Sequence, residues 1–162
     1  MADGGYDAGY SATECFWGTE AASLVKAFLT ERDVDGFAVL DVGCGEGKNA
    51  NAFAKAGASV IAIDCSDLAV ANGQRLFESK LIDWRVADAS SLILPADSFD
   101  VVVSYGLFHC LSDKASAERL ISNVQRATKP GGYNIFCTFN DRSQDLSAHP
   151  GFEPLLLGHE WY

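Results

Sequence analysis

The chain has 162 residues, of which 48% are hydrophobic and 21% charged, so it is long enough and apolar enough to form one globular domain with its own core. Its formal net charge of -10 disfavours nucleic acid as a partner, because an acidic surface repels phosphate and the 12 Lys and Arg are scattered singly along the sequence. A small molecule is the expected partner.

Cysteine usage and the N-terminal residues indicate a reducing compartment. The five cysteines are odd in number, widely spaced and free of any C-x-x-C pair, which indicates neither a disulfide framework nor a metal site. The first residues lack the basic and apolar regions of a signal peptide, and no apolar run approaches the length of a membrane span. We therefore expect a cytoplasmic protein without membrane contact.

Strands and helices are expected to alternate along the chain. Leu24, Val25, Phe28 and Leu29 share one face of an amphipathic helix that starts near Gly18. Short apolar runs predict five strands, at residues 37–42, 59–64, 82–86, 99–104 and 133–139. Helical patterns predict the segments between them, at residues 49–56, from residue 66 onward and at 113–128, and a Pro-Gly-Gly turn is expected at residues 130–132.

This alternation predicts an α/β fold, a Rossmann-like doubly wound sheet of parallel strands with helices on both faces. We expect a single domain over residues 1–162. Within it, residues 1–17 form a segment over the site, residues 18–140 form the core, and residues 141–162 form an incomplete C-terminal element.

A glycine-rich loop, residues 43–47 (G-C-G-E-G), follows the first predicted strand and opens a helix. Glycines there let the backbone turn sharply and approach a ligand at the carboxyl end of the sheet. A Walker A loop would need a glycine at Val42 and a Ser or Thr at Asn49, and a dinucleotide loop would need a glycine at Lys48. What remains is G-x-G-x-G preceded by the acidic Asp41.

Two carboxylates are expected beside this loop. Asp64 ends the second strand, about 20 residues beyond the glycines, where an acidic side chain can accept both hydroxyls of a ribose. The alternative role for Asp64 is a helix cap, but Ser66 is already available as the cap. Asp88 follows the third strand, where a carboxylate can accept an adenine amino group, although taken alone it would be a solvated turn residue.

These residues carry a family resemblance. The run at residues 39–47 resembles the first motif of class I S-adenosylmethionine-dependent methyltransferases, and Asp64, Asp88-Ala89 and residues 129–132 fall where the later motifs belong. Shorter runs at residues 6–8, 16–20, 45–50 and 128–134 are similar to the tellurite-resistance methyltransferases. The resemblance covers residues 18–139 and implies S-adenosylmethionine as the cofactor.

The resemblance also implies roles at the methionine end of that cofactor. Gly43, Cys44 and Gly45 would line the methionine through backbone groups. Asp41 would orient the loop or the amino group, and Ser104, at the end of the fourth strand, would offer its carbonyl to the ammonium.

At the adenosine end, the resemblance implies that Asp64 holds the ribose with Cys65 and Ser66 beside it. Asp88 and Ala89 would hold the adenine.

Three further residues have two interpretations each. Trp17 would lie on the N-terminal segment over the site, or else would be a buried core residue beside the first helix. His109 follows the fourth strand, where the family places residues that face the transferred methyl group, and its ordinary pKa near 6.5 suits a general base. The alternative is a partly buried His bonded to a backbone carbonyl. Cys110 is expected to be a small core residue rather than a nucleophile.

The implied reaction is methyl transfer to a small, soft acceptor, such as a thiol or a chalcogen oxyanion, which needs little base catalysis. In the family an antiparallel hairpin follows the fifth strand, and this sequence stops before such a pair. An alternative is therefore a truncated cofactor-binding protein without catalysis, acting as a partner subunit or fragment. The strand at residues 133–139 would then be an exposed edge through which a homo-oligomer could form. A nicotinamide-dependent oxidoreductase is a third alternative, which Lys48 disfavours.

Overall fold

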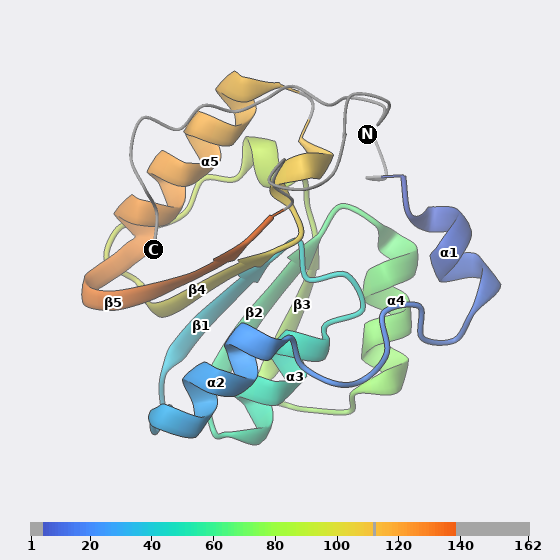
Figure 1. Cartoon of the computed structure of the whole chain (residues 1–162), viewed down its shortest axis with the longest axis horizontal. Helices are drawn as coiled ribbons and strands as arrows, with labels where there is room; N and C mark the ends of the chain where they lie inside the picture. The colour runs from blue at the N-terminus through green and yellow to red at the C-terminus, as the bar shows by residue number, and fades with distance from the viewer. Residues whose placement is uncertain (1–4, 112, 139–162) are drawn as a thin grey trace.

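The computed structural model of the protein describes residues 5–111 and 113–138 (Figure 1). Five parallel strands form one sheet in the order β3-β2-β1-β4-β5. They are β1 (Ala38–Val42), β2 (Ser59–Asp64), β3 (Ile82–Val86), β4 (Phe99–Tyr105) and β5 (Thr128–Cys137). The helices are α1 (Asp7–Ala12), α2 (Ser23–Glu31), α3 (Lys48–Lys55), α4 (Asp67–Leu76) and α5 (Lys114–Ala127), with short 3₁₀ helices η1 (Ala89–Ser91) and η2 (Phe108–Cys110). The predicted doubly wound sheet is confirmed.

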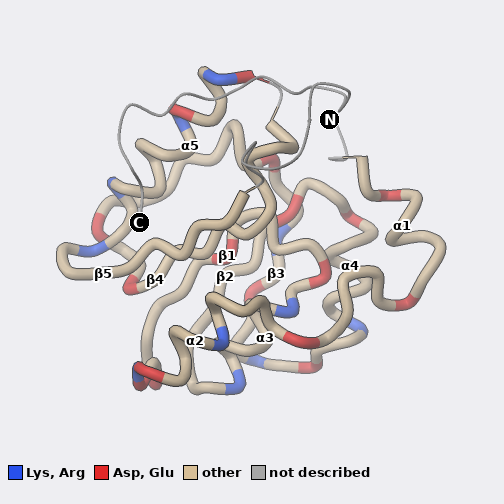
Figure 2. The backbone as a smooth tube through the Cα atoms, viewed as in Figure 1, with Lys and Arg blue, Asp and Glu red and all other residues tan. Residues whose placement is uncertain are grey.

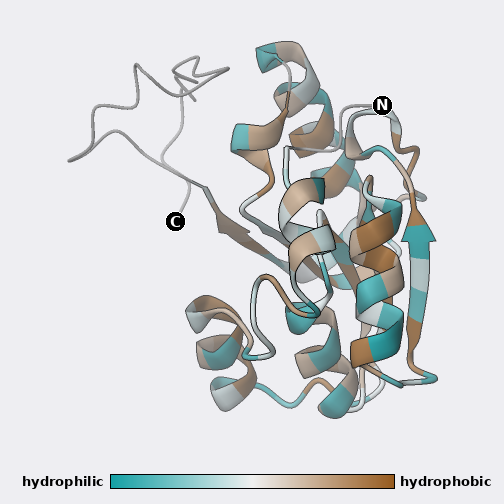
Figure 3. Ribbon diagram, turned by 90° about the vertical axis from the view of Figure 1, so that its right-hand side faces the viewer, coloured by the Kyte–Doolittle hydropathy of each residue, from teal (hydrophilic) through white to brown (hydrophobic). Residues whose placement is uncertain are grey.

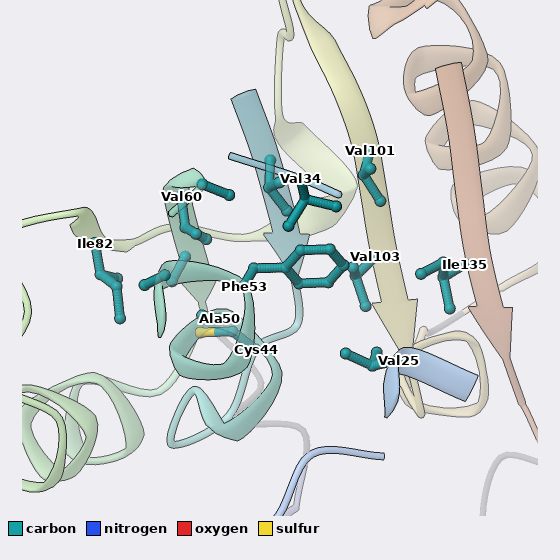
Figure 4. Packing of buried hydrophobic residues seen from close by; sticks show 14 of the residues in the cluster. Val25, Val34, Cys44, Ala50, Phe53, Val60, Ile82, Val101, Val103 and Ile135 are labelled. Carbon is teal, nitrogen blue, oxygen red and sulfur yellow. The ribbon is translucent and has the colours of Figure 1, made fainter. Parts of the chain in front are cut away.

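Helices cover both faces of this sheet, and each face has its own core (Figure 1). On one face, α2 and α3 pack on β1 and β4 around Phe53, which is surrounded by aliphatic side chains (Figure 4). On the other face, Leu120 and Val124 of α5 pack on Leu40 and Val102. The helices carry hydrophilic as well as hydrophobic residues, as amphipathic helices on a sheet require (Figure 3).

Two helices begin at the predicted residues with side-chain caps, of which Ser66 was predicted as a cap and Asp113 only as a helix start. The Ser66 hydroxyl accepts a hydrogen bond from the backbone N–H of Ala69 at 3.1 Å, and the Asp113 carboxylate accepts one from Ser116 at 2.7 Å. These bonds satisfy N–H groups that the first turn of a helix leaves without intrahelical acceptors. They confirm the predicted beginnings of α4 and α5.

The first long helix begins later than predicted. α2 starts at Ser23, not near Gly18, because the residues before it are held against the glycine loop. The backbone N–H of Ala22 donates to the side-chain oxygen of Asn49 at 2.9 Å, and this bond ends the extended segment. Leu24 is exposed rather than part of the buried face, whereas Val25 is fully buried. The short helix α1 was not predicted.

The predicted Pro-Gly-Gly turn lies inside β5. Phe99 pairs with Thr128 and Val101 pairs with Tyr133, so the turn bulges out of the ladder opposite a single residue of β4. The predicted fifth strand therefore begins earlier, at Thr128. The predicted last residue of this strand lies outside the described part of the chain. The same holds for the incomplete element expected at residues 141–162 and for the expectation that no hairpin follows.

Charge and hydropathy agree with the composition. Lys and Arg are dispersed among Asp and Glu along the described backbone (Figure 2). Over residues 5–111 and 113–138, no helix combines the length and the apolar character needed to cross a bilayer.

Candidate functional site

The glycine loop joins the carboxyl end of β1 to α3. Its backbone is fixed to the next strand, because the N–H groups of Gly43 and Cys44 both donate to the carbonyl of Ile63, at 2.8 and 3.0 Å. Gly45 and Gly47 have φ angles of 54° and 79°, in the left-handed region that favours glycine. The loop therefore turns sharply at the point where β1 separates from its neighbours, as the sequence predicts.

Asp64 binds this loop directly. One carboxylate oxygen accepts the N–H of Gly45 at 2.7 Å and the other accepts the N–H of Ser66 at 2.9 Å. Burial raises the pKa of Asp64, and the hydrogen bonds from these N–H groups oppose that effect. The residue remains partly exposed at the rim of the sheet, so a ligand above the loop can reach it.

Asp88 lies on the same rim as Asp64. The strands β2 and β3 are neighbours, and the N–H of Ala87 donates to the carbonyl of Asp64 at 2.9 Å. One oxygen of Asp88 accepts from the backbone and the hydroxyl of Ser90, at 2.8 and 2.7 Å, which caps η1. Ala89 is buried beneath it, while Asp88 itself stays partly exposed. The two residues thus lie at the carboxyl ends of neighbouring strands, and Asp64 contacts the glycine loop.

Asp41 and Ser104 are buried on the neighbouring strands β1 and β4. One oxygen of Asp41 accepts the N–H of Ala50 at 3.1 Å, but among the described residues neither its second oxygen nor the Ser104 hydroxyl has a hydrogen-bond partner. The pKa of Asp41 is raised to about 7, mainly by burial; the Ala50 N–H opposes this rise and the charge of Asp64 adds to it. Unsatisfied polar atoms of this kind are rare and mark places where a ligand or water can bind.

The N-terminal segment lies against the glycine loop. A Cβ added to Gly45 would be 3.2 Å from the Tyr10 hydroxyl and 3.3 Å from Cδ1 of Trp17, and the Trp17 indole N–H donates to that hydroxyl at 3.0 Å. Trp17 is 43% exposed, so the interpretation of a buried core residue is wrong. Trp17 lies against the glycine loop at Gly45, where the interpretation of a segment over the site places it.

Glu46 is a site residue that sequence reasoning missed. Its side chain is buried, and one oxygen accepts the backbone N–H groups of Phe16 and Trp17 at 2.7 and 3.1 Å. Its other oxygen accepts from the side-chain amide of Asn72 at 3.1 Å. From sequence alone, an acidic residue in a glycine loop is expected to face solvent. The partners of Glu46 lie 26 to 30 residues away along the chain, so local spacing does not indicate this role.

His109 lies in η2, beyond the end of β4, and it meets the N-terminal segment. Its Nε2 is 3.2 Å from the hydroxyl of Tyr6, a partner that the sequence does not indicate. Burial raises the pKa of Tyr6, and so does the neighbouring Cys110. Tyr6 therefore stays protonated at neutral pH and its hydroxyl can donate to the ring.

The thiols near the rim are unsuited to nucleophilic chemistry. Burial raises the pKa of Cys44 and of Cys110, and it raises that of Cys65 to about 11, with the charge of Asp64 adding to the effect. A thiol becomes a nucleophile only as the thiolate, so these residues are inert at neutral pH. In the described part of the chain, no group of three or more His, Cys, Asp or Glu side chains is placed to hold a metal ion.

The sheet order and the position of the loop define a Rossmann-like methyltransferase fold, with the site at the switch point where β1 lies between β2 and β4. Residues 40–136 match the family described as "Methyltransferase domain". The chain belongs to this family, and the alternative of a nicotinamide-dependent oxidoreductase is therefore wrong.

Individual proteins agree with this assignment. A ubiquinone biosynthesis O-methyltransferase of Thiobacillus denitrificans is 35% identical over 131 residues, which are 78% of this chain and 55% of that protein. The chain thus spans about half the length of the curated relatives it matches, from 43% to 59%.

Solved structures show the same similarity. An S-adenosylmethionine-dependent methyltransferase from Mesorhizobium loti has a TM-score of 0.60 and 29% identity, over 77% of this chain and 54% of that one. A TehB-like methyltransferase from Corynebacterium glutamicum has a TM-score of 0.58 and 26% identity, over 67% of this chain and 58% of that one.

Proposed function

We propose that the protein binds S-adenosylmethionine and transfers its methyl group to a hydroxyl of a small molecule. The observation that carries the proposal is the position of Asp64 and Asp88, side by side on one rim with Asp64 bonded to the glycine loop. The name of the solved Mesorhizobium loti relative supports the cofactor, and the name of the Thiobacillus denitrificans relative supports an oxygen acceptor.

The residues present fit this cofactor. The buried Asp41 oxygen and Ser104 hydroxyl, which lack partners among the described residues, offer hydrogen-bonding groups for an amino acid moiety beside Gly43, Cys44 and Gly45. A ligand ammonium beside Asp41 would stabilise the carboxylate and lower its pKa again.

The other rim residues fit the adenosine. Asp64 would accept the ribose hydroxyls, with Cys65 and Ser66 beside it, and Asp88 with Ala89 would hold the adenine. Trp17 would cover the cofactor from the N-terminal segment. When bound, the cofactor supplies a methyl group already activated on a sulfonium, so the protein has mainly to position the reactants and exclude water.

The acceptor would bind beside Tyr6 and His109. An alcohol or phenol is a poor nucleophile until it loses its proton, and a neutral imidazole can accept that proton. The Tyr6 hydroxyl lies 3.2 Å from Nε2 of His109, so the acceptor's proton would pass to the Tyr6 oxygen while Tyr6 passes its own proton to that nitrogen. This geometry favours a hydroxyl acceptor, because base catalysis would then contribute to the rate.

A soft acceptor is the second candidate, as the tellurite-resistance motifs in the sequence predict. A thiolate or a chalcogen oxyanion arrives already deprotonated, so His109 would add little to its methylation. The two candidates therefore differ in their dependence on His109.

The test compares His109→Gln with the unsubstituted protein, using labelled S-adenosylmethionine with a catechol and with a thiol as acceptors. For a hydroxyl acceptor, we expect transfer to fall by at least about 100-fold while affinity for S-adenosylhomocysteine stays constant, since general-base catalysis is commonly worth this factor. Lys114→Gln, an exposed change in α5 whose side chain pairs with Glu118, is the control and should keep the activity. Transfer to the thiol alone, unaffected by His109→Gln, would favour the soft acceptor. Cofactor binding without transfer to either would favour the non-catalytic binding protein.

Location, partners and assembly stay predictions from the sequence. The acidic charge disfavours nucleic acid, and the cytoplasm remains the expected location. Among the described strands β5 pairs with β4 alone, so its second edge remains the predicted place for a homo-oligomer contact.

A further inference from the structure

Glu46 joins three parts of the molecule that are distant in sequence: the glycine loop, the N-terminal segment and α4. Only 1% of the residue is exposed. A buried carboxylate is costly unless hydrogen bonds satisfy it, and here two backbone N–H groups and one amide do so. Bonds to an ionised acceptor are also stronger than neutral ones, so these contacts hold the segment firmly.

The partner on α4 is oriented by its own contacts. The oxygen of Asn72 accepts from Arg75, which leaves the Asn72 NH₂ group to donate to Glu46 at 3.1 Å and to the carbonyl of Tyr10 at 3.0 Å. Glu46 and Asn72 therefore bind the N-terminal segment at two points, at Tyr10 and at Phe16-Trp17.

The segment held in this way carries the groups that face the site. The centroid of the Trp17 ring lies 4.8 Å from that of Phe16 and 5.2 Å from that of Tyr6, and both pairs make edge-to-face contacts. Tyr6 in turn reaches His109, and Trp17 lies over Gly45. The position of Tyr6 thus depends on its ring contact with Trp17, and the position of Trp17 depends on its hydrogen bond to Glu46.

We propose that Glu46 is a positioning residue, which holds the N-terminal segment over the glycine loop and so sets Tyr6 against His109 and Trp17 over the cofactor. The consequence for catalysis rests on the proposed function, whereas the consequence for the segment does not.

These contacts require that both carboxylate oxygens of Glu46 accept hydrogen bonds. Glutamine has the same shape, but its amide has one acceptor and one donor. If its oxygen faces the N–H groups of Phe16 and Trp17, its NH₂ group faces the NH₂ group of Asn72. In the opposite orientation the NH₂ group faces the two backbone N–H groups. Either way one side loses its hydrogen bonds.

Glu46→Gln is therefore the test, and Glu20→Gln is the matched control. Glu20→Gln removes the same charge a few residues after Trp17. The Glu20 side chain is 84% exposed, and among the described ion pairs it contacts only Lys26. Amide hydrogen exchange of the protein without cofactor is the first measurement. We expect exchange at Phe16 and Trp17 to accelerate by about 10- to 100-fold in Glu46→Gln, the range for loss of a hydrogen bond to a charged group, with α5 and the sheet unchanged. The control should exchange like the unsubstituted protein.

The second measurement is affinity for S-adenosylhomocysteine, which we expect to weaken by about tenfold in Glu46→Gln. If Glu46→Gln does not fold, Asn72→Ala replaces it, since it removes one donor to Glu46 and the contact with Tyr10. Unchanged exchange at Phe16 and Trp17, or acceleration shared equally by the whole chain, would overturn the proposal. If the unsubstituted protein fails to bind the cofactor product, the proposed function fails, and the exchange data still decide the role of Glu46 in positioning the segment.

Discussion

The contact between Gly47 and Trp84 leads to a quantitative prediction. Gly47 has a φ of 79°, and a Cβ added there would overlap the six-membered ring of Trp84, a rigid side chain from β3. Two costs then add. A left-handed conformation costs a non-glycine residue about 1–2 kcal/mol, and overpacking a core contact costs about 1–3 kcal/mol. We expect Gly47→Ala to lower the free energy of unfolding by about 2–5 kcal/mol.

Gly131→Ala isolates the first of these costs. Gly131 has the same φ of 79°, but nothing lies within 4 Å of its added Cβ. This variant should lose only about 1–2 kcal/mol, which urea denaturation followed by circular dichroism can resolve. Trp84→Leu in the Gly47→Ala background should recover part of the difference, because it removes the overlapping ring. Equal losses in the two alanine variants would refute the assignment of the excess to Trp84.

Three further predictions concern buried polar groups. Burial raises the pKa of Asp41 to about 7, so the folded protein keeps a proton that the unfolded chain releases near pH 4, and the free energy of unfolding should fall with rising pH between these values. Asp41→Asn should therefore gain stability relative to the unsubstituted protein as pH rises from 4 to 7, with no further gain above about pH 8, and a pH-independent difference would contradict this. Ser66→Ala removes the cap of α4 and should cost about 1 kcal/mol by thermal denaturation, whereas an unchanged melting temperature would show that Ala69 has another acceptor. Asn49→Ala leaves the buried N–H of Ala22 unsatisfied and should cost about 1–3 kcal/mol in urea, with the largest increase in amide exchange at the start of α2.

The regular elements could be predicted because their signals are local. Apolar runs such as residues 99–104 fit strands buried on both faces, and Ser66 and Asp113 mark helix starts by a bond that spans three residues. Leu24 shows the limit of this reasoning, because hydrophobic periodicity cannot tell which apolar residues of a short helix finally meet the core.

Site residues on the strands could also be predicted, since parallel strands bring their carboxyl ends to one rim. Asp64 ends β2 and Asp88 follows the neighbouring β3, so both lie on that rim. Glu46 and Tyr6 could not be predicted, because their partners come from the N-terminal segment and η2, and only the folded chain brings these together. The Tyr6–His109 contact spans 103 positions, a distance at which spacing in one sequence carries no information.

Calorimetric titration with S-adenosylhomocysteine, with NAD in parallel, decides whether this rim of the sheet binds the methyl-donor cofactor. We expect S-adenosylhomocysteine to bind and NAD to give no heat. Asp64→Asn should weaken binding by about 10- to 100-fold, because the ribose loses a charged partner. Asp67→Asn, an exposed change three residues along the chain, should leave the affinity unchanged. Binding of NAD in place of S-adenosylhomocysteine, or equal affinity in the Asp64 variant, would contradict a cofactor site built on this rim.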